Sequence, residues 1–197
     1  MQNHFYSVIS RMKNINRWGL MRNTRSENLS EHSLEVAQIA HALALISRKR
    51  FGGKADPNAA AVAAMYHDTP EIITGDMPTP VKYSNSQIIT AYKQIEKAAE
   101  QRLMELLPED FKEEFEAIYS PDPEIARLVK AADKLSALIK CTEELNMGNQ
   151  EFAAAYDSVL AAVKALHCPE ADVFLAEFMP GFSLTLDEQN NRSEGKT

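Results

Sequence analysis

The chain has 197 residues and a formal net charge of −7 at pH 7, and 45% of its residues are hydrophobic. A chain of this length can bury roughly 70% of its unfolded surface in one core, and its negative charge argues against wrapping a nucleic-acid polymer. Seven glycines are fewer than a turn-rich β architecture needs.

A first amphipathic helix is predicted after Asn28. Asn28 supplies a capping side chain and Glu31 supplies a carboxylate three residues later, so the pair forms a capping box. Gly52-Gly53 ends this helix. Apolar residues recur within it at the spacing of one helix face: Val36, Ile39, Ala40, Leu43 and Ile46.

A second helix is expected from Asp56-Pro57, through an alanine-rich run, to Tyr66. Because alanine allows backbones to approach closely, we expect this helix to be central. Thr69-Pro70 is interpreted as the cap and start of another helix, which places His67-Asp68 at a helix end. Two prolines within residues 75–80 predict a loop there.

The second half of the chain continues the helical pattern without a repeat or a second-domain linker. The expected fold class is therefore all-α, a single-domain helical bundle over residues 1–186. The polar stretch 187–197 is predicted to be a mobile tail. Helices are predicted over about these ranges: 87–107, which Pro108 stops, 123–145, 151–166 and 171–178.

We expect a cytoplasmic protein with no membrane partner. No stretch approaches the roughly 18 apolar residues of a membrane span, and the first residues lack the apolar core of a signal peptide. Cys141 and Cys168 form neither a disulfide framework nor a CxxC pair, which is typical of a reduced protein.

Basic side chains gather near the start of the chain. Residues 1–54 hold nine basic and three acidic residues, whereas the remainder holds 12 basic and 25 acidic residues. One interpretation is a basic surface helix that pairs with acidic neighbours. The other is that arginines face a small anionic ligand, which needs only a few well-placed cations.

Three further features are each ambiguous when taken alone. His32 lies on the apolar face of the first predicted helix, where a histidine is more often a core residue than a ligand. The dipeptide His67-Asp68 arises readily by chance. Asp133 lies in the middle of a predicted helix, either exposed and paired with Lys130, or buried and in need of a cation.

Together these residues form a set. His67 follows His32 after 35 positions, and Asp133 follows Asp68 after another 65. Two imidazoles and two carboxylates from three helices suit a divalent transition metal ion with open positions for water.

This pattern, H…HD…D on helices, resembles the HD-domain phosphohydrolases. Further segments are similar to the bacterial 5′-deoxynucleotidase branch of that superfamily, and the likeness covers about residues 5–185. The Arg-Trp and Gly-Asp-x-Pro-Thr-Pro segments make the resemblance specific. The similar segments are Asn16-Arg17-Trp18, Ser30-Glu31-His32-Ser33, Tyr66-His67-Asp68, Glu71 and TGDMPTPVKY at 74–83.

The resemblance implies an HD-domain phosphohydrolase over residues 1–186 that converts deoxyribonucleoside 5′-monophosphates to a deoxyribonucleoside and phosphate. It also implies a homodimer and one divalent metal ion, Co²⁺ first, with Mn²⁺, Zn²⁺ or Cu²⁺ as alternatives. The residues implied to hold the metal are His32, His67, Asp68 and Asp133.

The same resemblance implies how the substrate is bound. Arg17 orients the phosphate, Trp18 lies against the sugar, and Glu71 is the acid–base carboxylate. Among the metal ligands, His32, Asp68 and Asp133 also face the substrate. The residues implied on the sugar hydroxyl side are Asp76, Met77, Pro78 and Thr79.

The physical chemistry of these residue types agrees with the roles. Two carboxylates balance the charge of one divalent ion, so a phosphate dianion also needs the planar fork of Arg17. The leaving alkoxide is poor, and an acid such as Glu71 typically helps by about 10²–10⁴-fold. Each role has an alternative: Glu71 compensates a helix dipole, Trp18 packs in the core, or Asp76 is a turn residue.

Missing motifs narrow the class of enzyme. No histidine lies between Asp68 and Asp133, so the extra ligands of two-metal HD phosphodiesterases are absent and a mononuclear site is expected. Ile72 follows Glu71, so the Glu-Asp pair of (p)ppGpp hydrolases is absent as well. Two alternatives stay open: an HD hydrolase of another nucleotide phosphoester (a triphosphate or phosphonucleotide), and a non-catalytic, metal-stabilised nucleotide-binding module.

Overall fold

Regular structure in this protein is helical. The computed structural model describes residues 3–82 and 84–191, and these contain no β-strand, only an isolated bridge between Asn16 and Asn28. The predicted all-α class is confirmed. No helix within the described ranges combines the length and apolarity needed to cross a bilayer. The α-helices are α1 (Phe5–Ile9), α2 (Leu29–Ile46), α3 (Pro57–Tyr66), α4 (Glu71–Thr74), α5 (Thr79–Lys82), α6 (Ser86–Met104), α7 (Lys112–Tyr119), α8 (Pro123–Asn146), α9 (Ala153–Ala165), α10 (Pro169–Glu177) and α11 (Leu186–Asn191).

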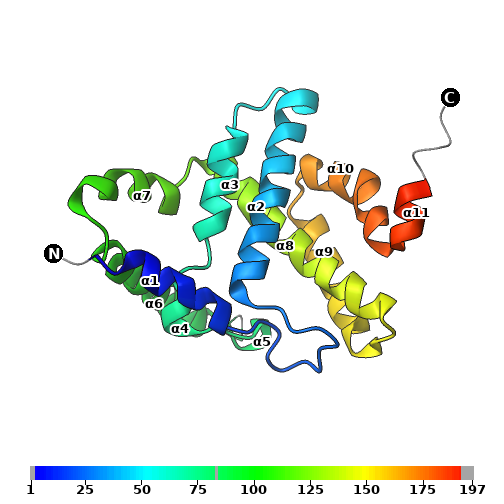
Figure 1. The fold of residues 1–197 in the computed structure, drawn as a ribbon, viewed down its shortest axis with the longest axis horizontal. Coiled ribbons are helices and arrows are strands. Elements are labelled where there is room, and N and C mark those ends of the chain that lie inside the picture. Colours follow the sequence, from blue (N-terminus) through cyan, green and yellow to red (C-terminus); the bar gives the residue numbers. More distant parts are fainter. Residues whose placement is uncertain (1–2, 83, 192–197) are drawn as a thin grey trace.

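Helices α2, α3 and α8 make the centre of the molecule, where α3 runs beside α2 and α8 crosses both (Figure 1). Asn28 caps α2 as predicted: its side chain accepts the backbone N–H of Glu31, whose carboxylate accepts the N–H of Asn28. Asp56 caps α3, in which Ala60 and Ala64 are completely buried. These small residues allow the close approach that was predicted for a central helix.

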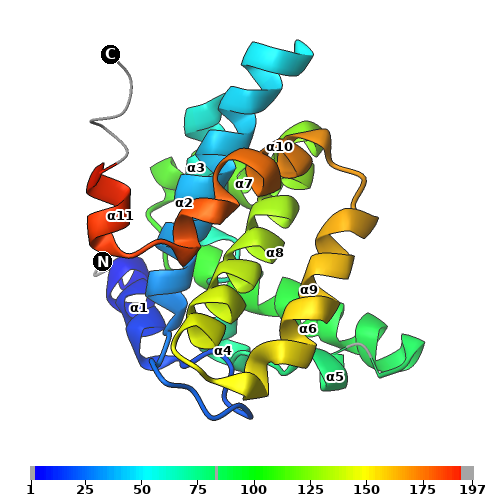
Figure 2. The same cartoon turned by 90° about the vertical axis from the view of Figure 1, so that its right-hand side faces the viewer.

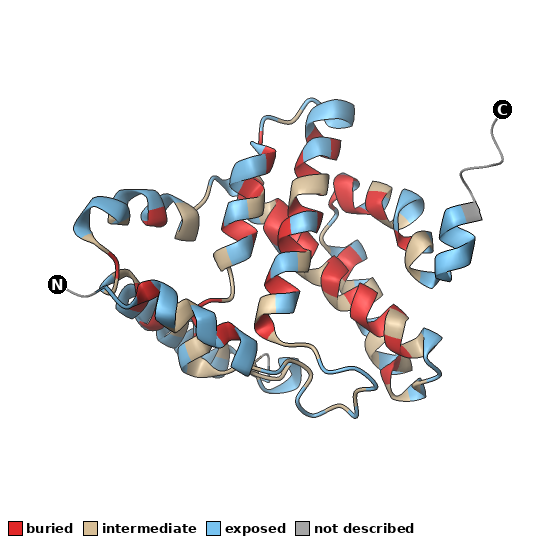
Figure 3. Cartoon of the chain, in the orientation of Figure 1, coloured by how far each residue is buried: buried red, intermediate tan, exposed pale blue. Residues whose placement is uncertain are grey.

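The main apolar core fills the space between these three helices, and α9 and α10 cover it. Buried residues line the facing sides of the central helices in Figure 3, and Figure 2 shows α9 alongside α8. Leu43 of α2 and Leu128 and Leu135 of α8 are completely buried. Each such leucine contributes about 1.5–3 kcal/mol, so the core holds α2 and α8 in fixed relation.

A second, smaller apolar cluster joins α1, α6 and α7. Its fully or nearly buried members are Phe5, Leu103, Leu107 and Phe115. The ring of Tyr66, at the end of α3, lies 5.2 Å from that of Phe115 between centroids. The second cluster therefore holds the end of α3, where His67 follows.

Two local predictions between α3 and α6 are wrong. Thr69 does not cap a helix: its hydroxyl donates to the carbonyl oxygen of Tyr66 at 2.7 Å and lies 2.8 Å from the hydroxyl of Tyr119. The predicted loop at 75–80 ends early, because α5 begins at Thr79. A proline in the first turn of a helix forfeits no intrahelical hydrogen bond, so Pro80 does not prevent it.

The remaining differences concern short elements and helix ends. Helix α6 ends at Met104 rather than at 107, and α1 and α7 were not predicted. Within the predicted mobile tail, residues 187–191 belong to α11 and residues 192–197 lie outside the described part of the chain. Mobility of the tail therefore stays a prediction.

Candidate active site

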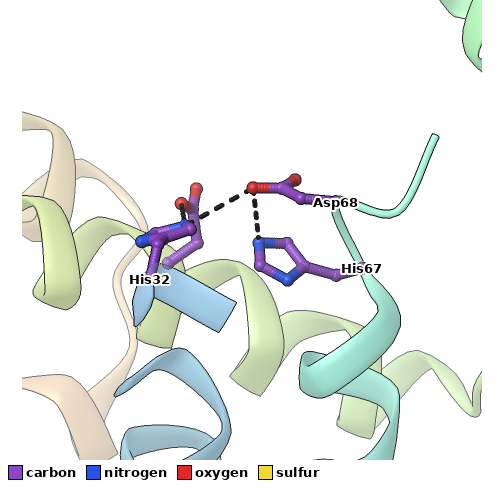
Figure 4. Close-up of side chains that lie close together, drawn as sticks. His32, His67 and Asp68 are labelled. Carbon is purple, nitrogen blue, oxygen red and sulfur yellow. Dashed lines mark ion pairs between the residues drawn. The ribbon is translucent and has the colours of Figure 1, made fainter. Parts of the chain in front are cut away.

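Side chains from three helical regions meet at one point. His32 comes from α2, His67 and Asp68 follow α3, and Asp133 comes from α8; we call these four residues the HD cluster. One ligand atom of each lies within 4.8 Å of the others. His32 is completely buried and the other three are partly buried. Figure 4 shows His32, His67 and Asp68 converging, so the structure brings together the residues that the sequence predicted as a set.

The hydrogen bonds of both imidazoles leave Nε2 turned toward the cluster. His67 Nδ1 lies 2.7 Å from the carbonyl oxygen of Ala64, which can only accept, so Nδ1 carries the hydrogen. His32 Nδ1 lies 3.0 Å from the hydroxyl of Ser136, which donates its own hydrogen to Glu35 at 2.6 Å, so this Nδ1 also donates. Nε2 of both rings is buried and makes no hydrogen bond of good geometry, although carboxylate oxygens lie 3.1–3.4 Å away. Once it gives up its proton, this nitrogen is the atom through which each imidazole can bind a metal.

The carboxylates of the HD cluster stabilise positive charge. His32 Nε2 lies 3.4 Å from Asp68 and 3.3 Å from Asp133, and His67 Nε2 lies 3.1 Å from Asp68. Burial lowers the pKa of His67, but Asp68 and Asp133 outweigh it and raise that pKa to about 9. Burial raises the pKa of Asp68, but the two histidines hold it well below its ordinary value. Two nitrogen and two oxygen donors whose surroundings favour positive charge fit a divalent transition metal ion.

Arg17 and Trp18 approach the HD cluster from the segment before α2. Arg17 Nη1 lies 3.4 Å from Asp68, and its Nε lies 3.3 Å from Glu27. Trp18 Nε1 donates to the same Glu27 at 3.0 Å, and the Trp18 ring lies 5.4 Å from the ring of Phe152. Trp18 is partly buried, so it both packs against the protein and keeps an accessible face.

Glu144, near the end of α8, holds the loop that follows Trp18. Its carboxylate accepts the backbone N–H groups of Thr24 at 2.9 Å and Arg25 at 3.2 Å. The side chains of Asn149, at 2.7 Å, and Lys140 also donate to it. The far end of the arginine-bearing loop is therefore fixed to a core helix.

Sequence reasoning missed the residues that support the site. Lys140 and Glu144 are four residues apart, a spacing typical of a solvent-exposed helix pair, yet both are buried. Glu27, Glu35 and Ser136 carry no signal in the sequence, because their partners are remote or depend on how the chain is folded.

Glu71 and Asp76 lie near the HD cluster on the segment after α3. Glu71 is 5% exposed, and its Oε2 has no hydrogen-bond partner. Burial, together with Asp68 and Asp76, raises the pKa of Glu71 to about 9, despite the opposing charges of Arg17 and Lys82. In the metal-free protein this favours the protonated carboxyl group of Glu71, which can donate a proton. Burial also raises the pKa of Asp76, against the pull of Arg17.

The remaining predicted substrate residues lie along the segment that leads into α5. Met77 and Pro78 are partly exposed and Thr79 is exposed, so all three are accessible. Two alternatives were open for Asp133, and the structure shows neither in full: its side chain is partly buried, and its carboxylate lies 3.3 Å from Lys134 rather than pairing with Lys130.

A cavity borders the HD cluster on the side of α3, α7 and α8. Its volume is about 310 Å³, and its walls include His67, Asp133, Tyr119 and Lys130. The side chains of His67, Asp68 and Asp133 are 16%, 19% and 26% exposed, so the cluster can be reached from outside the protein.

Comparison with known proteins agrees with this geometry. The chain matches the profile of the family described as 5′-deoxynucleotidase YfbR-like over residues 4–182. The 5′-deoxynucleotidase YfbR of Escherichia coli is 50% identical over 190 residues, which span 95% of this chain and 96% of that protein. The chain belongs to the YfbR-like 5′-deoxynucleotidase family. Membership confirms the predicted family, the enzyme class and the main activity, 5′-deoxynucleotide hydrolysis.

Solved structures extend the comparison of this YfbR-like chain to its fold. An HD-domain phosphohydrolase from Listeria innocua has a TM-score of 0.78 at 21% identity, covering 95% of this chain and 92% of that chain. The cyanophage S-2L HD phosphohydrolase DatZ, bound to dA and one catalytic Zn²⁺ ion, has a TM-score of 0.65 at 19% identity, covering 91% and 96%. The predicted HD-domain helical fold is confirmed.

Proposed function

We propose that this chain is a metal-dependent 5′-deoxynucleotidase that hydrolyses deoxyribonucleoside 5′-monophosphates to a deoxyribonucleoside and phosphate, with residues 1–186 as its catalytic domain. The observation that carries the proposal is the HD cluster with Arg17 beside it, 3.4 Å from Asp68. In a family named for this activity, a cation site and a guanidinium at one point form a binding place for a phosphate dianion.

The HD cluster is proposed to hold one divalent ion, Co²⁺, with Mn²⁺, Zn²⁺ and Cu²⁺ as alternatives. The buried, unpartnered Nε2 atoms of His32 and His67 support this assignment, as does the Zn²⁺ ion bound by the cyanophage protein. When bound, such an ion supplies a Lewis acid that polarises the phosphate ester and makes water more acidic. In this arrangement His32, Asp68 and Asp133 border the phosphate as well as the ion.

Arg17 is proposed to bind the phosphate. Its contacts with Glu27 and Asp68 use two of the five N–H donors that a guanidinium offers, so the others are available to phosphate oxygens. The planar fork fits two of those oxygens at once, which orients the ester as well as attracting it.

Glu71 is proposed to be the general acid. A water molecule adds to phosphorus, the bond between phosphorus and the 5′-oxygen breaks, and the 5′-oxygen takes the proton from Glu71. The proton that the water releases restores the acid. The raised pKa of Glu71, about 9 in the absence of metal, supports this role because it favours the protonated carboxyl group that a general acid needs.

Trp18 and the segment from Asp76 to Thr79 are proposed to face the sugar. The indole of Trp18, held by Glu27 and packed near Phe152, forms a wall that would crowd a 2′-hydroxyl and so favour deoxyribose. Asp76 would accept a hydrogen bond from a sugar hydroxyl, with Met77 and Pro78 beside it.

We also propose that the enzyme works in the cytoplasm as a homodimer on free nucleotides. The net charge of −7 supports a small-molecule substrate rather than a nucleic-acid polymer. The dimer rests on the resemblance to the 5′-deoxynucleotidase branch.

The test measures phosphate release from dAMP and AMP by metal-stripped protein reloaded with Co²⁺, Mn²⁺, Zn²⁺ or Cu²⁺. We expect release from dAMP, restored by metal, and little from AMP. His32→Ala should abolish release, whereas His41→Ala, on the same helix but outside the HD cluster, should retain it. Release of pyrophosphate or triphosphate from a nucleoside triphosphate would favour the alternative hydrolase, and binding without hydrolysis would favour the non-catalytic module.

A further inference from the structure

A single carboxylate oxygen joins the two side chains that are proposed to bind phosphate and sugar. Oε2 of Glu27 lies 3.3 Å from Arg17 Nε and accepts the indole N–H of Trp18 at 3.0 Å. The side chain of Glu27 is only 14% exposed, so these contacts are poorly screened by water. The backbone reinforces them, because the N–H of Arg17 donates to the carbonyl oxygen of Glu27 at 2.9 Å.

The backbone of Trp18 is strained, which indicates that its position is imposed. Its φ is +58°, a left-handed conformation that costs a residue with a side chain roughly 1–2 kcal/mol. Glycine adopts this conformation without a steric penalty, but tryptophan does not, so contacts with the surrounding residues must hold Trp18 in it. Its carbonyl oxygen accepts the N–H of Met21 at 2.9 Å and the side-chain amide of Asn23 at 3.2 Å, and its ring lies near Phe152. Strain that the surroundings maintain in this way is typical of functional sites.

Arg17 is held at both ends of its guanidinium. Nε faces Glu27, while Nη1 lies 3.4 Å from Asp68 in the HD cluster. Without Glu27, the guanidinium would keep its contact with Asp68 but lose the second point that fixes its direction, so the arginine could turn about Asp68. The carboxylate of Glu27 therefore sets the direction in which Arg17 presents its other donors.

We propose that Glu27 is a positioning residue that aligns Arg17 and Trp18 as one unit, so that phosphate binding and the choice of deoxyribose depend on a common carboxylate. This inference rests on the proposed function, which assigns those two side chains to the substrate. Glu27 itself touches neither the substrate nor the metal in this scheme.

The test compares Glu27→Gln with Glu143→Gln, a partly buried glutamate of α8 outside this network. Loss of a charged hydrogen-bond acceptor should raise KM for dAMP roughly tenfold and lower the dAMP-to-AMP preference several-fold. Because Trp18 is the only tryptophan, its fluorescence emission and acrylamide quenching should change in Glu27→Gln and stay unchanged in Glu143→Gln. A purely structural role would lower the melting temperature without moving the sugar preference.

A double-mutant cycle tests whether Glu27 acts through Trp18. If Glu27 acts through the indole, Glu27→Gln should no longer alter sugar preference in a Trp18→Phe background. Suppose that Glu27→Gln keeps the wild-type KM, sugar preference and fluorescence while Arg17→Ala and Trp18→Ala have altered kinetics. This result would overturn the role of Glu27 and leave the proposed substrate contacts standing. Wild-type kinetics in Arg17→Ala and Trp18→Ala as well would overturn both this inference and the proposed substrate contacts.

Discussion

Replacing Glu144 with glutamine should destabilise the protein in a pH-dependent way. Glu144 is completely buried and accepts hydrogen bonds from two backbone N–H groups, Asn149 and Lys140. Glutamine keeps the shape and one acceptor oxygen, but it leaves the ammonium of Lys140 buried without its counter-charge. Breaking one side of a buried ion pair costs about 3–5 kcal/mol in proteins.

The contribution of Glu144 to the free energy of unfolding follows from the pKa of its carboxyl group. Burial alone would raise the pKa of Glu144, but Lys140, Asn149 and the backbone N–H groups lower it from 4.5 to about 2. Because the folded pKa is the lower one, the contribution is complete above pH 4.5 and is lost as the pH falls toward 2. Linkage gives about 3 kcal/mol at pH 7 and about 1.5 kcal/mol at pH 3.

The assay is urea unfolding of the wild type and Glu144→Gln at pH 7 and pH 3, in the presence of a chelator. Metal must be removed because its binding adds a stability term that itself depends on pH. The gap between the two proteins should be about 3 kcal/mol at pH 7 and should shrink by about half at pH 3. Glu143→Gln, at the neighbouring position, should change stability by no more than about 0.5 kcal/mol.

A gap of the same size at both pH values would refute this reasoning, because the loss would then come from packing rather than from ionisation. A gap below about 1 kcal/mol at pH 7 would show that Glu144 is not held in the ionised state by its partners.

Other predictions concern the HD cluster. Ser136→Ala removes the hydroxyl that contacts His32 Nδ1 and should weaken Co²⁺ binding about 10–100-fold in a chelator competition. Ser33→Ala, at another buried serine, should leave the affinity unchanged. Equal affinities in the two variants would show that Ser136 does not support the metal site. Glu71→Gln should lower kcat for dAMP by about 10²–10⁴-fold without loss of metal. In the wild type, kcat should fall on the alkaline side as Glu71 loses its proton. The pKa of Glu71 is about 9 without metal, and the bound cation lowers it, so the midpoint of the fall in the metal-loaded enzyme should lie below pH 9. The same fall in Glu71→Gln would assign it to another group. Saturating Co²⁺ at about 100 times its Kd should stabilise the protein by about 2.7 kcal/mol, with the response lost in His32→Ala and kept in His41→Ala; a response that survives in His32→Ala would place the ion elsewhere.

The helices that could be predicted are those whose start and period are local. Asn28 with Glu31, Asp56 with Pro57, and Pro123 each mark a helix start through contacts a few residues apart. No distant part of the chain is needed to form them. The long amphipathic stretches between these signals supplied the all-α class in the same way.

Short elements depended on the tertiary structure. Helix α1, with five residues, is too short to show a period. Both α1 and α7 are stabilised because Phe5 and Phe115 are buried together with Tyr66. Thr69 has the residue type of a helix cap, yet its hydroxyl is taken up by Tyr66 and by Tyr119 from a distant helix. Residue type shows which local structures these segments can form, and tertiary packing determines which of those structures they adopt.

For the candidate site as well, some features could be predicted from the sequence and others depended on the tertiary structure. Residue types and their order by themselves indicated His32, His67-Asp68 and Asp133 as a set, because few other arrangements use two imidazoles and two carboxylates in this pattern. Only the folded chain determined that Nδ1 of each histidine is occupied, that Asp68 faces Arg17, and that the charges of the cluster favour a cation. Hydrogen bonds and electrostatic interactions depend on distance in space and on burial, and positions 35 or 65 residues apart in the sequence specify neither until the core has formed.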